Sequence, residues 1–395
     1  MLGMYKRKIG FFSVLVLIII CAGSVFAQTQ RDWWYTFERG KVLFRQGSYG
    51  NALLAFEDAR RQRRAMYERM ERSLIDLLSI PEVRRMGDSL DWVERFAHER
   101  NYPGAAEALE ELYYRIPRET FKNSASAALA ALQTLKDYPE AELWIGETYL
   151  VEGELNLAIG QFQKALAMRY LMDNPAFATE LLYKIAAIRR TRQEYTEMER
   201  VLLSIVNTDN LWMGGSGSTA ERRAVPDENP GMQASGSFAR QALTRTLENF
   251  GINRFITMYR YRNEESAEAH RLLGYYYYSS GRHARAQEHL MFAFLIQNTV
   301  IIEEIVYRQF DFTFTTLEAL TPEIHRNPMI REYAAKNEYY KTAYYLGSSL
   351  YGNGKTASAQ GIWNFLSAQN DAGEWQSRAR AQIRSPHVER AIEMP

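Results

Sequence analysis

The chain has 395 residues, of which 46% are hydrophobic and 24% are charged, with 48 Lys and Arg against 47 Asp and Glu. These fractions are typical of a folded protein, and the near-zero net charge argues against a nucleic-acid surface, which needs a concentrated basic face. A single cysteine excludes a disulfide framework and a cysteine-based zinc site. The length allows two or three compact domains or one elongated repeat array, and the 13% of aromatic residues need an explanation.

The first 27 residues predict a secretory signal peptide. Basic residues at 6–8 precede an apolar core at 11–21 and a short end of small residues that fits cleavage after Ala27. The apolar core is too short to span a membrane comfortably. The alternative is a lipoprotein acylated at Cys21, although the residue before this cysteine is not small. After cleavage the chain has no cysteine and a net charge of −2, and we expect it in the periplasm.

A repeat emerges when the chain is compared with itself. Four anchor glycines are each followed by a glycine at +7, an alanine at +12 and a large apolar residue at +16. The anchor glycines and their +12 alanines are Gly40 and Ala52, Gly146 and Ala158, Gly274 and Ala286, and Gly347 and Ala359. Weaker copies lie at 96–117 and 186–205, and a degenerate pair is expected in 238–262.

The spacings of three, four and seven residues within each copy predict helices rather than strands. The small residues are expected where two antiparallel helices cross closely, and the large residue at +16 fills the gap to the next unit. The glycine at +7 is expected to end the first helix, because glycine tolerates the positive φ that such an end requires.

These residues make the chain resemble the tetratricopeptide-repeat (TPR) family over 31–206 and 238–370. With an inserted helix and a capping helix, the C-terminal array is expected to span 238–384. The resemblance implies an all-α fold, a right-handed superhelical solenoid of helical hairpins whose concave face holds a peptide or helix of a partner. Gly40 and Gly146 are 106 residues apart, or about three units of the roughly 34-residue period of this family.

The pattern is interrupted and ended in three places. Residues 207–237 are rich in Gly, Ser, Pro and Asn and predict a flexible loop, either a connector or a binding loop anchored by Leu211–Met213. An inserted helix is expected at 299–320. A capping helix at 372–384 is expected to cover the last hydrophobic face, and the tail 385–395 is expected to fray.

No catalytic, cofactor or metal motif stands out. Residues 352–356 look like a phosphate loop, but the motif needs a further glycine where Ser349 stands, and it needs a preceding strand. The six histidines have no metal-ligand spacing, so we expect no cofactor and no enzyme activity. The basic run 60–64 is interpreted as a solvated helix face, with docking on anionic envelope polymer or lipid as the alternative.

The family's geometry points particular side chains of each first helix toward the concave face. This predicted partner face is partly aromatic, which favours protein binding, because Tyr and Trp dominate interface hot spots. Its residues are Trp34, Phe37, Phe44, Leu143, Leu150, Arg271, Tyr275, Tyr278, Tyr344 and Tyr351.

Together these features predict a non-enzymatic periplasmic scaffold that binds other envelope proteins, with membrane contact at most peripheral, no nucleic acid and a homo-oligomer left open. We expect the scaffold to be a structural part of a flagellar motor or similar machine. An adaptor for outer-membrane or cell-wall biogenesis and a solute-binding protein are the alternatives.

Overall fold

The computed structural model describes residues 32–86, 90–115, 125–174, 176–208 and 236–389. Within these ranges the chain forms helices and turns without a strand, which confirms the all-α class for this part of the protein. The expected signal peptide, with Ala27 and Cys21, lies outside the described residues, as do most of the 207–237 loop and the last six residues of the tail.

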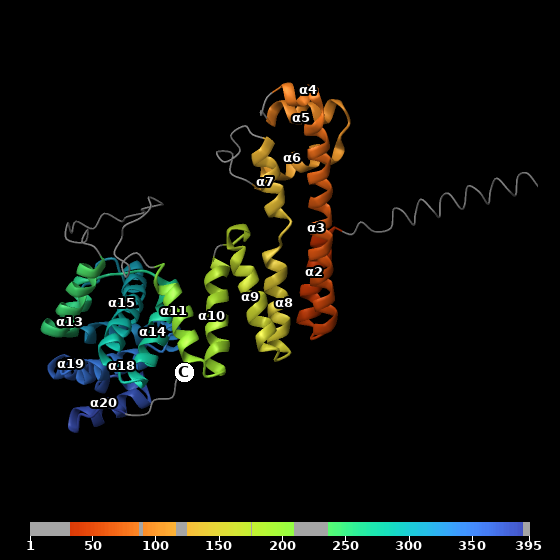
Figure 1. Ribbon diagram of the computed structural model, residues 1–395. Helices are drawn as coiled ribbons and strands as arrows, with labels where there is room; N and C mark the ends of the chain where they lie inside the picture. The colour runs from red at the N-terminus through yellow and green to blue at the C-terminus, as the bar shows by residue number, and fades with distance from the viewer. Residues whose placement is uncertain (1–31, 87–89, 116–124, 175, 209–235, 390–395) are drawn as a thin grey trace, which may run out of the picture. The chain divides into compact units, whose positions relative to one another are not determined.

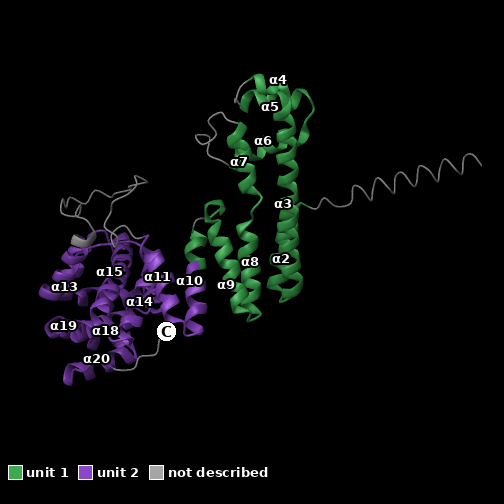
Figure 2. Cartoon of the chain, in the orientation of Figure 1, with its two compact units in different colours: residues 1–181 green, residues 182–395 purple. Residues whose placement is uncertain are grey.

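The chain divides into two compact units, residues 1–181 and 182–395 (Figure 2). The division lies within α10 (Ala176–Thr191), so the second unit takes in the end of this helix and also α11 (Tyr195–Val206). The sequence had assigned both segments to the first array.

The first unit is organised around a single long helix, α3, of 31 residues (Figure 1). Its other elements are shorter. In chain order the unit contains α2 (Trp33–Arg45), α3 (Tyr49–Ser79), α4 (Pro81–Arg85), α5 (Leu90–Glu99), α6 (Pro103–Arg115), α7 (Ala125–Leu135), α8 (Pro139–Val151), α9 (Leu155–Ala167), η1 (Arg169–Leu171) and the start of α10.

The two halves of α3 belong to different hydrophobic cores. The first half packs with α2 and α8, where the Phe56 ring stacks on Trp144 with 5.7 Å between the ring centroids. The second half packs with α5, α6 and α7. The hairpin α2–α3 therefore neighbours α8 directly, and the weaker copy at 96–117 does not stack between the two as the 106-residue spacing suggested. The reason is the length of α3, whose far end provides a separate apolar surface for residues 80–135.

The second unit is built from consecutive hairpins. In chain order it contains the end of α10, α11, α13 (Gly236–Met258), α14 (Glu264–Ser279), α15 (His283–Arg308), η2 (Leu317–Leu320), α16 (Thr321–Arg326), α17 (Pro328–Lys336), α18 (Tyr339–Gly352), α19 (Thr356–Ser367), η3 (Asn370–Ala372) and α20 (Glu374–Arg384). The hairpin α14–α15 contacts α11 before it and α18 after it, and α13 packs on α15 and α19.

The anchor glycines lie inside four helical hairpins: α2–α3, α8–α9, α14–α15 and α18–α19. A Cβ atom on Gly40 or Gly146 would lie 2.5 Å from the ring of the aromatic residue at +16. On Gly274 it would lie 2.4 Å from Leu290, and on Gly347 it would lie 2.9 Å from Trp363. The +12 alanines of all four copies are fully buried. The hairpins therefore share one packing register.

The turn of each hairpin is closed by a residue with positive φ. In the four strong copies this residue is the predicted glycine, with φ of 76°, 82°, 72° and 76° in chain order. In the weaker copies Asn101 and Gln193 adopt φ of 58° and 59°. Each turn also has a backbone hydrogen bond that spans five residues, such as the one from Glu154 N to Tyr149 O at 2.9 Å. These are the bonds of a Schellman helix end.

Helix α15 is the central helix of the second unit. Among the described helices it is the one long and apolar enough to cross a membrane, but 72% of its apolar window is buried inside the unit. Residues 299–308 continue this helix, 309–316 are irregular, and 317–320 form a 3-10 turn. The inserted helix expected at 299–320 is therefore absent as a separate element. The apolar run that suggested it extends α15, because the core of the unit continues alongside it.

The last described helix, α20, packs against α19, and its Ala379 is fully buried. The expected fraying of the tail is wrong for residues 385–389. This segment is tied back onto α14, α18 and α20 by hydrogen bonds to their side chains.

Candidate functional site

The predicted partner face of the first unit is only partly open to solvent. Trp34 is 52% exposed, whereas Phe37 is buried against Tyr138. The other three predicted residues, Phe44, Leu143 and Leu150, are half-buried. Contrary to the sequence expectation, Phe37 does not lie on an open face, because Tyr138 and the following helix α8 pack against it.

In the second unit the structure buries the predicted tyrosines. Tyr275, Tyr278 and Tyr344 are at most 1% exposed, and Tyr351 and Arg271 are half-buried. These three fully buried tyrosines do not form an open binding face, contrary to the sequence prediction. Two structural causes account for this. Consecutive first helices contact one another, and the end of the chain lies over them.

The segment 385–389 covers this aromatic surface through polar contacts. The hydroxyl of Tyr344 donates to the carboxylate of Glu389, and Tyr351 donates to the carbonyl of Pro386 at 3.2 Å. The Glu389 backbone N–H donates to the hydroxyl of Tyr278 at 3.3 Å. Burial and the hydrogen bond to Glu389 raise the pKa of Tyr344, and burial raises the pKa of Tyr278 to about 12. Both hydroxyls therefore stay protonated at neutral pH.

Arg378 on α20 is the cation at this surface. One of its Nη atoms lies 2.6 Å from a carboxylate oxygen of Glu389. Its guanidinium also lies over the rings of Tyr344 at 5.0 Å and Trp375 at 4.7 Å from the ring centroids. The aromatic rings hold the guanidinium in place, so the surface presents a fixed positive group to a carboxylate.

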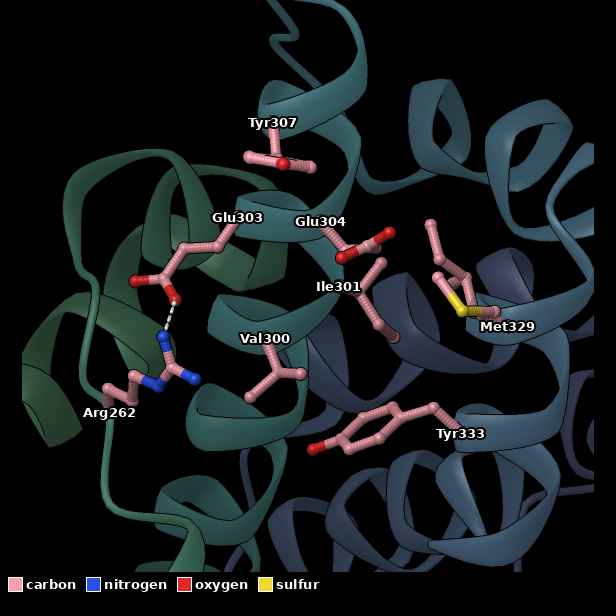
Figure 3. A pocket seen from close by; sticks show the side chains of 9 residues that line it. Arg262, Val300, Ile301, Glu303, Glu304, Tyr307, Met329 and Tyr333 are labelled. Atoms are coloured by element: carbon pink, nitrogen blue, oxygen red, sulfur yellow. Dashed lines mark hydrogen bonds and ion pairs between the residues drawn. The ribbon is translucent and has the colours of Figure 1, made fainter.

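A separate pocket of about 550 Å³ opens between α15 and α17 (Figure 3). Val300 and Ile301 of α15 face Met329 and Tyr333 of α17 across it. The walls are apolar because Ile301 and Ile330 belong to the hydrophobic core of the unit and Tyr333 packs against it. No sequence motif predicts this pocket. The apolar and aromatic residues between 299 and 335 include most of its lining, so their clustering was the available sequence signal.

Charged groups line one rim of this pocket. An Nη atom of Arg262 lies 3.1 Å from a carboxylate oxygen of Glu303, and this ion pair lies along one side of the pocket (Figure 3). Glu304 pairs with Arg308 on the same helix at 2.7 Å. The rim also has an exposed aromatic residue, since Tyr307 is 87% exposed. The pocket thus combines an apolar floor with one arginine and two glutamates at its edge.

The basic run 60–64 is not a uniformly solvated face. Arg63 is only 3% exposed, donates to the carbonyl of Leu135 at 3.1 Å, and lies over the ring of Tyr138 at 4.5 Å from its centroid. Arg60 pairs with Glu142 at 2.7 Å, and Arg64 lies 3.4 Å from Asp137. The interpretation as a solvated face is wrong for Arg63, because the helical twist turns it toward α7 and α8.

The second unit contains a pair of buried histidines whose contact was not predicted from the sequence. His270 and His289 lie on the two helices of one hairpin with their Nδ1 atoms 3.1 Å apart, and both are at most 3% exposed. Burial lowers the pKa of His289 well below its usual value, and His270 lowers it further. Their sequence separation of 19 residues suits no metal motif, and the described residues bring together no group of three potential metal ligands.

Comparisons with known proteins add one relative. No protein-family description matches the sequence. The chain is similar to an uncharacterized protein of Treponema pallidum (strain Nichols), with 22% identity over 355 residues. The similarity covers 89% of this chain and 90% of that protein, so it extends into both compact units. Because that relative is itself uncharacterized, the comparison gives no information about function, and a functional proposal has to rest on the structure.

Proposed function

We propose that this protein is a non-enzymatic scaffold of the TPR type that binds other proteins of a bacterial cell envelope. The hairpins with one shared packing register support the repeat assignment. Rigid hairpins of this kind place exposed side chains at fixed positions, which lowers the entropy cost of binding. The observation that carries the binding function is the apolar pocket between α15 and α17, with the exposed Tyr307 at its rim.

The pocket suits an apolar side chain of a protein partner. Met329 is 55% exposed and Tyr307 is 87% exposed, and both line the pocket. Exposed large apolar side chains around a hollow are a common mark of an interaction surface, and Met adapts its shape to different partners.

The proposed site of action is the periplasm, with export through the segment 1–27. The mature protein isolated from cell envelopes should begin at Gln28 and have the mass of an unmodified chain. A fatty-acylated mass beginning at Cys21 would instead identify a lipoprotein. Either mass spectrum separates the two processing routes, and a retained N-terminus would contradict export by cleavage.

In-cell photo-crosslinking tests the binding function. A photoreactive phenylalanine at position 307 should capture a specific protein, whereas one at 250 should not. Phe250 is a matched control because it is 70% exposed on α13, outside the pocket. The substitution Met329→Ala should weaken capture at 307 by about tenfold, since a buried apolar contact contributes roughly 1–2 kcal/mol. Failure to capture any protein at 307 would overturn the proposal.

The identity of the captured protein would also show in which envelope assembly the scaffold acts. Recovery of flagellar motor components would identify a structural part of that machine, the assembly that we propose to test first. Recovery of outer-membrane or cell-wall synthesis proteins would assign it to biogenesis instead.

A further inference from the structure

We propose that the surface formed by Tyr278, Tyr344, Tyr351 and Arg378 is a second binding site, whose ligand is an extended protein segment carrying a glutamate. The chain's own residues 385–389 occupy this site and compete with that ligand. The site is separate from the pocket of Figure 3 and does not depend on the pocket being functional.

The way that the segment 385–389 is held supports a recognition role. Tyr351 donates to the Pro386 carbonyl, and the side-chain carbonyl of Gln382 accepts from the His387 N–H at 2.9 Å. These contacts involve backbone groups, so any extended segment can make them. The Glu389 carboxylate adds two contacts that depend on side-chain identity, since one of its oxygens accepts from Tyr344 and the other pairs with Arg378. The site therefore selects an acidic side chain at one position.

The segment has few apolar contacts to keep it in place. All five of its side chains are at least partly exposed, and Val388, the most apolar of them, is 37% exposed. Hydrogen bonds to side chains thus provide most of its attachment, and ordering the segment opposes them with lost conformational entropy. A partner segment that added an apolar side chain against Trp375 would compete effectively, because Trp375 is itself only partly buried.

The surface beneath the segment stays formed by contacts of its own. Arg378 remains stacked on aromatic rings, and Gln382 donates to the Tyr344 hydroxyl at 3.2 Å. When residues 385–389 leave, the hydroxyl of Tyr344 loses its acceptor. The Arg378 guanidinium and the Tyr344 hydroxyl then offer donors to a new carboxylate, and hydrogen bonds to an ionised group are stronger than those between neutral groups.

A peptide-binding experiment tests this inference. The probe is a fluorescent peptide with the sequence of residues 385–395, and the receptor is the mature protein truncated after Arg384. We expect saturable binding that weakens at least tenfold in the untruncated protein, where the segment competes in cis. The peptide with Glu389→Gln, and the truncated receptor with Arg378→Gln, should each bind at least tenfold more weakly.

Two controls separate this result from damage to the fold. Arg380→Gln is a matched substitution on the same helix, since Arg380 is exposed and bonds only to the Ser367 carbonyl. It should leave binding unchanged. The full-length variant Glu389→Gln loosens the segment without truncation and should bind the unaltered peptide more tightly than the wild-type protein does.

Two outcomes would overturn the inference. One is a lack of peptide binding by both the truncated and the Glu389→Gln proteins, and the other is equal binding by the truncated and wild-type proteins. The Tyr307→Ala variant should leave peptide binding unchanged, so failure here is distinguishable from failure of the proposed pocket function.

Discussion

The Cβ position of Gly146 lies 2.5 Å from the ring of Phe162, sixteen residues further along the chain. The Phe162 ring thus lies directly against the backbone of Gly146, and this close approach sets the distance between α8 and α9. The same relationship joins Gly40 to Phe56 in the first hairpin, so glycine at the anchor and a large side chain at +16 are one structural unit. The stability of the repeat should therefore respond to both positions together.

The substitution Gly146→Ala should destabilise the first unit by up to about 2 kcal/mol. The new methyl group would overlap the fully buried ring of Phe162, which costs about 1–3 kcal/mol in a packed core. Alanine would return about 1 kcal/mol of helix propensity. Urea unfolding followed by circular dichroism measures the difference. Gly160→Ala is the matched control in α9, where a Cβ atom meets nothing within 4 Å, and it should stabilise. Equal effects of the two substitutions would contradict the packing argument.

The turns make a second prediction, at Gln193. This residue holds φ of 59° at the end of α10, in the position that glycine takes in the strong copies. Gln193→Gly should stabilise the second unit by about 1 kcal/mol, because a non-glycine residue in the left-handed region is strained. The reciprocal change Gly153→Ala, at φ of 82°, should destabilise the first unit by a similar amount. Thermal unfolding measures both, and a loss of stability in Gln193→Gly would contradict the prediction.

Local spacing predicted the hairpins well because the rules that govern them are local. Gly274 and Leu290 face each other across one turn, and the constraint is complete within 17 residues of sequence. The order of packing was not predictable in this way. That α8 neighbours α2–α3 depends on the length of α3, which no spacing rule encodes.

The candidate site was harder to predict for the same reason. The projection of Tyr344 toward a concave face used only its place in a repeat, yet its ring packs on Trp375 and its hydroxyl is bonded to Glu389, 45 residues later. Nothing in the tail's composition signals that contact. The pocket of Figure 3 arises at the margin of the repeats, where α17 meets the end of α15, so repeat geometry did not reveal it.

Arg63 provides a third prediction. Its guanidinium is buried between α3, α7 and α8 and lies over the rings of Trp33, Tyr67 and Tyr138. Arg63→Ala should destabilise the first unit by about 2–4 kcal/mol, since it removes a charged hydrogen bond and several cation–π contacts and leaves a cavity. Arg61→Ala is the matched control on the same helix, because the Arg61 side chain is 71% exposed. It should change stability by less than about 0.5 kcal/mol. A small effect of Arg63→Ala in urea unfolding would refute a stabilising role.

The buried histidine pair predicts that the second unit loses stability as the pH falls. The pKa of His289 is lowered in the folded protein, so below about pH 6.5 the unfolded chain binds a proton that the folded chain does not. Unfolding therefore becomes more favourable as the pH falls. The loss from this one group between pH 7.5 and 5.5 is about 1.4 kcal/mol. Below pH 5.5 the free energy of unfolding continues to fall until the pH reaches the lowered pKa of His289 in the folded protein. Urea unfolding of the mature protein at several pH values measures this slope.

The contribution of His289 to that slope can be isolated by substitution. His289→Gln retains a polar side chain next to His270 and should flatten the dependence on pH by up to one proton, even if it lowers stability at neutral pH. Leu290→Val, at the next position of α15, should lower stability by a similar amount at pH 5.5 and 7.5, because it removes core volume without a titrating group. If both variants kept the wild-type slope, the acid sensitivity would have to come from groups other than this histidine.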